Sequence, residues 1–204
     1  MNRTLEHILP RVQKPARYTG GEYNAVVKDR RAVDVRYALC FPDTYEIGMS
    51  NLGVRILYGL MNEMDGVWCE RVFAPWGDME EEMRREGIPL YVVESGDSIA
   101  DFDLIGFSLG YEMAYTNVLN MLDLAGLPLR SGERTELSPI VVAGGTCAFN
   151  PEPLAPFVDL FVLGEGEDVS VEIIQLYRQA REEGWGKEEF LTAAARIPGV
   201  YVPS

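Results

Sequence analysis

Short apolar runs alternate with segments of helical period along this sequence, and the alternation constrains the fold more than any other feature. Runs of strand length lie at 33–41, 67–73, 89–94, 102–109, 139–145 and 158–163. Helical segments are predicted at 1–11, 52–64, 74–87, 112–124, 168–182 and 187–196. In the second of these, Leu52, Ile56 and Leu60 recur every four residues, as on the buried side of an amphipathic helix. Because strands that alternate with helices form parallel sheets covered on both faces, the sequence predicts an α/β fold with a doubly wound, mainly parallel sheet.

The chain divides into three predicted parts. Residues 1–32 hold a short helix and an arm that contains glycine and proline, KPARYTGGEYN. Residues 33–182 form the α/β domain, and residues 183–204 form a further helix and an extended linker. A chain of 204 residues is long enough for one domain with such extensions.

The stretch VRYALCFPDTYEIGMS, residues 35–50, carries the first candidate site. Its apolar run is short enough for a buried strand, and Pro42 ends that strand because proline has no amide hydrogen to donate. Asp43, Tyr45 and Gly48 follow in the loop that leads to the next helix. A strand, a polar loop and a helix start together form the ligand end of a doubly wound sheet, although any α/β fold has such a first connection.

Small or polar residues follow four of the predicted strands, at 43–48, 108–110, 144–146 and 164–167. The carboxyl ends of parallel strands lie on one edge of a sheet, where ligands bind. Glycine at these ends lets a ligand approach the backbone closely, although tight turns also need glycine. We therefore expect a ligand crevice at this edge, with turn geometry alone as the alternative. Its candidate residues include Ser108, Gly144, Gly145, Gly164 and Glu165.

Composition limits the partners of this chain. The net charge of −14 argues against sequence-independent binding to nucleic acid or to an anionic membrane, since both depend on clustered lysine and arginine. The three cysteines, Cys40, Cys69 and Cys147, are too widely spaced for a metal site or a disulfide framework. No segment resembles a signal peptide or reaches membrane-spanning length. These features predict a cytoplasmic protein without a metal site.

Several catalytic motifs are missing from the sequence. No G-x-G-x-x-G follows the first strand, and no G-x-x-x-x-G-K-S/T occurs. His7 is the only histidine, so a Ser-His-Asp or Cys-His arrangement cannot form. We therefore predict no catalytic residue in this chain.

The residues at the strand ends are similar to those of the cobalamin-binding domain, whose pattern is Asp-x-His-x-x-Gly, Ser-x-Leu and Gly-Gly. The corresponding residues here are Asp-x-Tyr-x-x-Gly at 43–48, Ser108-Leu109 and Gly144-Gly145. Longer segments resemble the N-terminal half of cobalamin-binding-domain radical S-adenosylmethionine (SAM) proteins: KPARYTGGE, FPDTYEIGMSNLG, ERVFAPWGDME, DLIGFSLGYEMAYTNVLNML, GGTCAFNPEPLAPFVDLFVLGEGE and IPGVY. The resemblance covers nearly the whole chain and implies a Rossmann-like fold of the cobalamin-binding type.

The resemblance also implies roles for individual residues. Asp43 and Gly48 would shape the loop below the corrin ring, and Ser108 and Leu109 would line the channel for the nucleotide tail of cobalamin. Gly144 and Gly145 would make room for that tail. Tyr45 stands where the family has its cobalt-binding histidine, and a neutral phenol is a poor cobalt ligand. Cobalamin is therefore expected to bind without a histidine lower ligand, if the site is retained.

The cysteine triplet that holds the 4Fe–4S cluster of radical SAM enzymes is absent from this chain. In the resembled family the cluster domain follows a segment like 197–201, and this sequence ends at Ser204. The expectation is an accessory domain truncated before the iron–sulfur barrel and inactive alone. It would hold a corrinoid or substrate near a 4Fe–4S and S-adenosylmethionine site on a barrel domain, in cis or in trans.

Two other hypotheses remain at this point. The chain could be a non-catalytic interaction scaffold that has lost cobalamin, with side chains such as Met49, Tyr111 and Met113 filling the old cavity. It could also be an independent enzyme for a small ligand, although it lacks a catalytic histidine and a phosphate loop.

Overall fold

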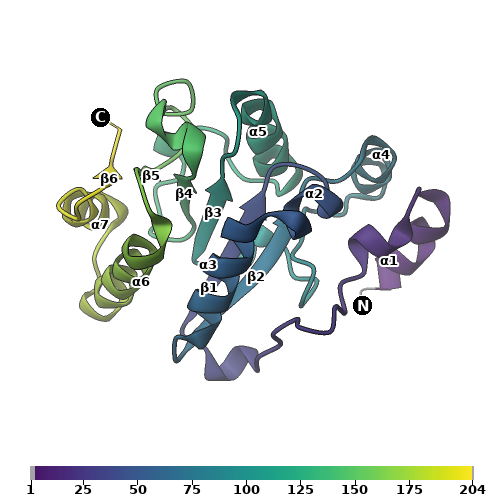
Figure 1. The fold of residues 1–204 in the computed structure, drawn as a ribbon, viewed down its shortest axis with the longest axis horizontal. Helices are drawn as coiled ribbons and strands as arrows, with labels where there is room; N and C mark the ends of the chain where they lie inside the picture. The colour runs from purple at the N-terminus through teal and green to yellow at the C-terminus, as the bar shows by residue number, and fades with distance from the viewer. Residues whose placement is uncertain (1–2, 204) are drawn as a thin grey trace.

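The computed structural model describes residues 3–203, so Met1, Asn2 and Ser204, which belong to the predicted first helix and linker, lie outside the described residues. Its centre is a six-stranded sheet with the order β2-β1-β3-β4-β5-β6 (Figure 1). The strands are β1 (Val35–Phe41), β2 (Val67–Phe73), β3 (Leu104–Ser108), β4 (Ile140–Gly144), β5 (Leu160–Val162) and β6 (Val200–Tyr201). All pairings from β2 to β5 are parallel, and only β6 is antiparallel to its neighbour. This topology confirms the predicted doubly wound, mainly parallel α/β fold.

Helices cover both faces of the sheet. They are α1 (Arg3–Ile8), α2 (Tyr45–Ser50), α3 (Leu52–Glu63), α4 (Gly77–Glu86), α5 (Tyr115–Leu124), α6 (Gly166–Glu183) and α7 (Lys187–Ala194). Buried side chains of α3, α6 and α7 share one hydrophobic cluster, on what we call the α3 face. Those of α1, α4 and α5 belong to the other cluster, on the α5 face. The first segment of the chain lies toward β2, and the last lies at the β5–β6 end of the sheet (Figure 1).

Every residue of β1 is buried, as expected for a central strand of a parallel sheet. Side chains alternate between the two clusters: Tyr37 and Leu39 pack on the α3 face, whereas Ala38 and Cys40 pack on the α5 face. The strand order puts β1 and β3 side by side at the point where the winding of the chain reverses direction. In doubly wound folds, this switch point is where the crevice for a ligand opens at the carboxyl edge.

The predicted strand at 89–94 is wrong. Within it the structure has only an isolated bridge, between Tyr91 and Ser98. The Glu94 carboxylate accepts a hydrogen bond from the backbone amide of Arg71 at 2.7 Å. The Val93 amide donates to the Arg71 carbonyl at 2.9 Å. Because a side chain takes up the amide that a neighbouring strand would use, the segment lies beside β2 without extending the sheet.

The N-terminal arm covers the edge strand β2. Lys28 donates to the Val67 carbonyl at 2.5 Å, and the Trp68 indole donates to the Val26 carbonyl at 3.0 Å. Glu22 accepts hydrogen bonds from Arg71 at 2.9 Å and from the Tyr45 hydroxyl at 2.6 Å. Covering an edge in this way prevents it from pairing with another chain.

We predict that Glu22→Gln lowers the free energy of unfolding by about 1–2 kcal/mol at neutral pH, because it removes a charged partner of a buried arginine. Burial opposes ionisation of Glu22, but the Tyr45 hydrogen bond and the Arg71 charge outweigh it and lower its pKa. The carboxylate therefore stabilises the fold above its unfolded pKa, and this contribution is lost as the pH falls through the folded value. Urea unfolding at pH 7 and near pH 4 should show the difference between variant and wild type shrinking at the lower pH.

Glu63→Gln is the matched control, since Glu63 is exposed and forms no salt bridge with the described residues. A loss of stability at Glu22 that is equal at both pH values would contradict this account of the arm.

Candidate functional site

A trough opens at the carboxyl edge of the sheet, on the α3 face, because of the way the chain leaves each strand. The connections after β3 and β4 pass to the α5 face, where Val118, Ala148 and Leu154 are buried. The connections after β1 and β5 lead into α3 and α6 on the α3 face. The carboxyl halves of β3 and β4 consequently have no helix of their own on that face. The trough above them has a volume of about 460 Å³, within the usual range for ligand pockets.

Glycines keep the floor of the trough low. Gly106 and Ser108 of β3 and Gly144 of β4 lie on it, and Leu57 of α3 and Ser170 of α6 form its walls. The remaining lining residues are Tyr37, Leu39, Gly53, Phe107, Val142, Gly145, Thr146, Phe149, Val162, Gly164, Glu165, Gly166 and Glu167. The two walls approach each other where a Cβ on Gly166 would lie 3.6 Å from the Leu57 side chain.

Tyr37 lies at the buried side of the trough. A Cβ on Gly106 would lie 1.9 Å from the Tyr37 hydroxyl oxygen, so the phenol occupies the space where a side chain at position 106 would be. The residue as a whole is only 5% exposed, but its hydroxyl oxygen is not among the buried polar atoms that lack a hydrogen-bond partner. Burial raises the pKa of Tyr37, so the phenol remains protonated and can donate.

The lining of the trough includes acidic side chains besides its apolar ones. No lysine, arginine or histidine is among its lining residues in the described part of the chain, whereas Glu165 and Glu167 are. Neither carboxylate forms a salt bridge with the residues that the structure describes. The trough therefore offers hydrogen-bond acceptors and unpaired negative charge at the start of α6.

Several residues predicted from the sequence come together in this trough: Ser108, Gly144, Gly145, Gly164 and Glu165. Gly145 has a φ of 97°, and a Cβ there would lie 2.7 Å from the Leu109 carbonyl oxygen. Position 145 therefore needs glycine for the close passage of two strand ends, whether or not a ligand binds.

The other predicted residues lie outside the trough. The Asp43 carboxylate accepts from the Tyr111 hydroxyl at 2.7 Å and from the Thr44 amide at 2.6 Å, so it ties the loop after β1 to the loop after β3. The Leu109 side chain is buried in the cluster on the α5 face, and its amide donates to the Gly144 carbonyl at 2.7 Å.

Tyr45 and Gly48 pack against β2 and the arm. The Tyr45 ring meets the Phe73 ring edge-on at 5.2 Å, and a Cβ on Gly48 would lie 2.4 Å from the Phe73 ring. Burial, with a further contribution from Glu22, raises the pKa of Tyr45 to about 12. This phenol is engaged in a hydrogen bond and is not available as a metal ligand.

Sequence reasoning did not single out Tyr37 or Gly106. Leu39 and Gly106 are register partners, which makes Tyr37 and Gly106 diagonal neighbours across two strands. The sequence does show a tyrosine in one apolar strand and a glycine in another. Recognising that the two are neighbours requires the register of β1 against β3, which the sequence alone does not provide.

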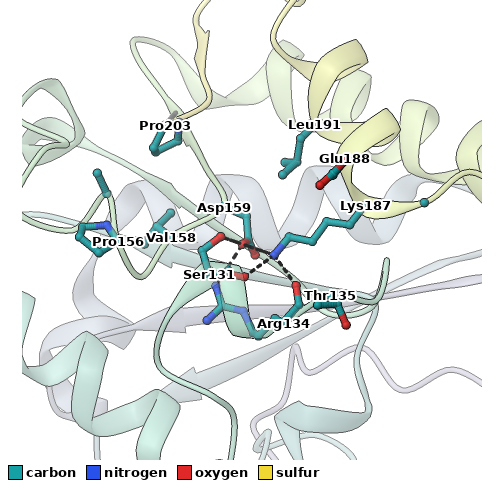
Figure 2. Close-up of a pocket in the computed structure, with 13 residues that line it drawn as sticks. Ser131, Arg134, Thr135, Pro156, Val158, Asp159, Lys187, Glu188, Leu191 and Pro203 are labelled. Atoms are coloured by element: carbon teal, nitrogen blue, oxygen red, sulfur yellow. Dashed lines mark hydrogen bonds and ion pairs between the residues drawn. The ribbon is translucent and has the colours of Figure 1, made fainter.

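A second hollow, of about 660 Å³, lies at the opposite edge of the sheet, where β4 and β5 begin (Figure 2). Lys187, Asp159, Ser131 and Arg134 converge in it. Lys187, the first residue of α7, is 2.7 Å from the Asp159 carboxylate and donates to the carbonyls of Ser131 and Arg134 at 2.8 and 2.7 Å.

This second hollow is larger than the trough, but its polar groups bind one another. Arg134 donates to the carbonyls of Pro128, Leu129 and Phe157 and to Asp159. The second carboxylate oxygen of Asp159 accepts a hydrogen bond from the Val141 amide at 2.7 Å. We interpret this cluster as a structural anchor of α7 and of the loop before β4, because its buried polar atoms bind one another, with Arg134 Nε as the exception.

Two further observations concern metal ions and membranes. Within residues 3–203, no group of three or more His, Cys, Asp or Glu side chains is placed to hold a metal ion. Over the same range, no helix combines the length and the apolar composition needed to cross a bilayer.

The fold and the trough define a doubly wound α/β domain with an open trough at its switch point. The family model described as "Radical SAM proteins, N-terminal" matches residues 53–203. The match covers most of the chain, and the chain therefore belongs to this family of N-terminal domains of radical SAM proteins. This confirms the radical SAM part of the resemblance in the sequence, whereas the cobalamin-binding part remains a prediction.

An uncharacterized protein of Methanocaldococcus jannaschii is similar to this chain. The two are 27% identical over 140 residues, which are 67% of this chain and 26% of the archaeal protein. The matched part thus spans about a quarter of that relative's length.

We predict that Lys187→Met lowers the free energy of unfolding by about 3 kcal/mol, because it leaves two carbonyls and part of a buried carboxylate without a donor. Urea unfolding followed by circular dichroism measures the effect. Glu188→Gln, at an exposed neighbour in the same hollow, should change stability by less than about 0.5 kcal/mol. Equal stabilities for Lys187→Met and wild type would refute the structural role of the cluster.

Proposed function

We propose that this chain is the accessory N-terminal domain of a radical SAM protein and that its trough receives part of a cobalamin. The observation that carries the proposal is the open trough over Ser108, Gly144 and Gly145, at the switch point of a chain in the radical SAM N-terminal family. The domain would hold the cofactor, or a substrate, against the catalytic domain. The 4Fe–4S cluster and S-adenosylmethionine would be bound by that catalytic domain.

The residues present fit the nucleotide tail of cobalamin. The trough volume of about 460 Å³ suits one arm of a large ligand, and the glycine floor leaves the backbone of β3 and β4 open to close approach. Bound cobalamin would supply the chemistry of its cobalt, and this chain would supply position and shielding. Because the Tyr45 hydroxyl donates to Glu22, this residue would not bind the cobalt of the cofactor.

An apolar rim around the trough supports docking of the catalytic domain at this edge. Large exposed side chains lie in the segments that follow β1, β3 and β4: Ile47, Leu52, Tyr111, Met113 and Phe149. Met113 is 83% exposed and Phe149 is 69% exposed. Apolar side chains that gather around a pocket mark interaction surfaces. The rim is therefore the surface proposed to face the radical SAM barrel, whether that barrel is in the same chain or in another.

The alternative of an interaction scaffold without cofactor has one observation in its favour. The space beneath α2 is filled, because Gly48 packs directly on Phe73 and Tyr45 packs beside it. The open trough over Ser108 and Gly144 favours retained binding, since a scaffold has no need of a low glycine floor.

We predict that hydroxocobalamin perturbs the fluorescence of the wild-type domain saturably and that the domain shifts its visible absorption bands. Gly144→Leu should weaken this binding at least about tenfold, because the new side chain fills the floor of the trough. Position 144 tolerates a side chain in its backbone conformation, and a Cβ there meets Val162 only at 3.6 Å.

Gly132→Leu is the matched control. It makes the same change in open space at the opposite edge of the sheet and should leave binding unchanged. Urea unfolding of both variants separates lost binding from lost folding. Absence of any saturable response from the folded wild-type domain would favour the scaffold instead.

A further inference from the structure

The outward side of α3 carries apolar side chains that the fold leaves exposed. The recurrence of Leu52, Ile56 and Leu60 predicts the buried side of this helix, and that prediction is wrong about the side. The residues of α3 that are buried are Val54, Tyr58 and Met61. Leu52 is 66% exposed, Ile56 is 43% exposed and Leu60 is partly exposed. We call these three side chains the α3 ridge; the helix that carries them lies on the near side of the sheet in Figure 1.

Two glycines flank the α3 ridge. Gly53 and Gly59 belong to the rows of residues, also spaced by four, that run on either side of it. Apart from the backbone of its own helix, a Cβ on Gly59 would have no heavy atom within 4 Å, so nothing in the described fold requires glycine there. Glycine inside a helix is also unfavourable relative to alanine. Low rows beside an exposed apolar ridge form the surface into which the ridge of another helix packs.

This surface is complementary to itself. The sequence L-G-x-x-I-x-x-G-L, which begins at Leu52, has the same pattern in both directions around Ile56. A two-fold axis at Ile56 that relates two antiparallel copies of α3 would bring the two isoleucines together. Leu52 would then lie beside Gly59 of the second copy, and Leu60 would lie beside its Gly53. Each leucine would thus meet a position where the other helix has no side chain.

Charge favours a second copy in this orientation. The only charged residues of α3 are Arg55 and Glu63, and neither forms a salt bridge with the described residues. A parallel pair of helices would bring like charges together. Antiparallel packing brings the Glu63 end of each helix toward the half of the other that carries Arg55, and opposite charges attract.

We propose that the α3 ridge is a dimer contact, packed antiparallel against the same ridge of a second copy of this chain. This inference goes beyond the proposed function and does not depend on cobalamin binding. A catalytic domain over the trough would meet the carboxyl edge, where α3 begins, whereas Ile56 and Leu60 lie further along the helix toward the start of β2. One pair of helices buries less than the roughly 1,600 Å² of a standard interface, so we expect a dissociation constant of about 10–300 µM.

Sedimentation velocity of the full chain between about 5 and 500 µM measures this association, and the wild-type chain should change from monomer to dimer over that range. Ile56→Glu should weaken dimerisation at least about tenfold, because it places two carboxylates together at the axis. Met113→Glu is the matched control and should leave the dissociation constant unchanged. Met113 is also apolar and exposed, but it lies in the segment after β3.

Gly59→Gln separates the contact from folding. The glutamine side chain has open space in the monomer and favours helix, so the urea midpoint should rise. Dimerisation should nevertheless weaken at least about fivefold, because the same side chain occupies the place of Leu52 of the second copy.

A wild-type chain that stays monomeric at the highest of these concentrations would overturn the inference and leave the α3 ridge to another partner, such as the catalytic domain. A dimer that withstands both Ile56→Glu and Gly59→Gln, or one that Met113→Glu abolishes, would also overturn it. Hydroxocobalamin binding by a strict monomer would leave the proposed function standing without the dimer. Dimerisation without such binding would support the α3 contact and count against a cobalamin site.

Discussion

The trough depends on one constraint of chain connection: the segments that leave β3 and β4 cross to the α5 face, while α3 and α6 flank the other face. Two adjacent strands therefore reach the carboxyl edge without a helix above them on the α3 face. Gly144 preserves this gap, since a larger residue there would fill it from below, whereas the space above Gly106 is occupied by the Tyr37 phenol. The trough is thus a product of topology.

The Lys187–Asp159 cluster and the proposed binding trough lie at opposite edges of the same sheet. At the edge where the strands begin, Asp159 links β4, the loop before it and α7 through hydrogen bonds and ion pairs. At the carboxyl edge, Glu165 and Glu167 have no cationic partner among the described residues. These contacts hold the strands in position at the edge where they begin. The groups around the trough are thereby kept at fixed distances from one another.

The sequence was sufficient for the fold and for part of the site. Hydrophobic period and strand length predicted β1, β2 and the helices α3 and α4, because these depend on neighbouring residues. The predicted strand at 89–94 was wrong because the Glu94 side chain replaces a ladder partner, which is a tertiary contact. Ser108, Gly144 and Gly164 could be placed at one edge from the direction of the strands alone. Tyr37 could not, because its place in the trough depends on the register of β1 against β3 and on the phenol lying over Gly106.

The most direct measurement of the central claim is amide chemical-shift mapping of the isotopically labelled chain during addition of hydroxocobalamin. The account predicts that the shifts concentrate at Gly106, Ser108, Gly144 and Gly164–Glu167, with the loop around Gly132 and the start of α7 unaffected. Shifts that cluster instead around Gly132, Gly186 and Lys187 would show that the ligand site lies at the opposite edge of the sheet. That result would contradict the assignment of the trough.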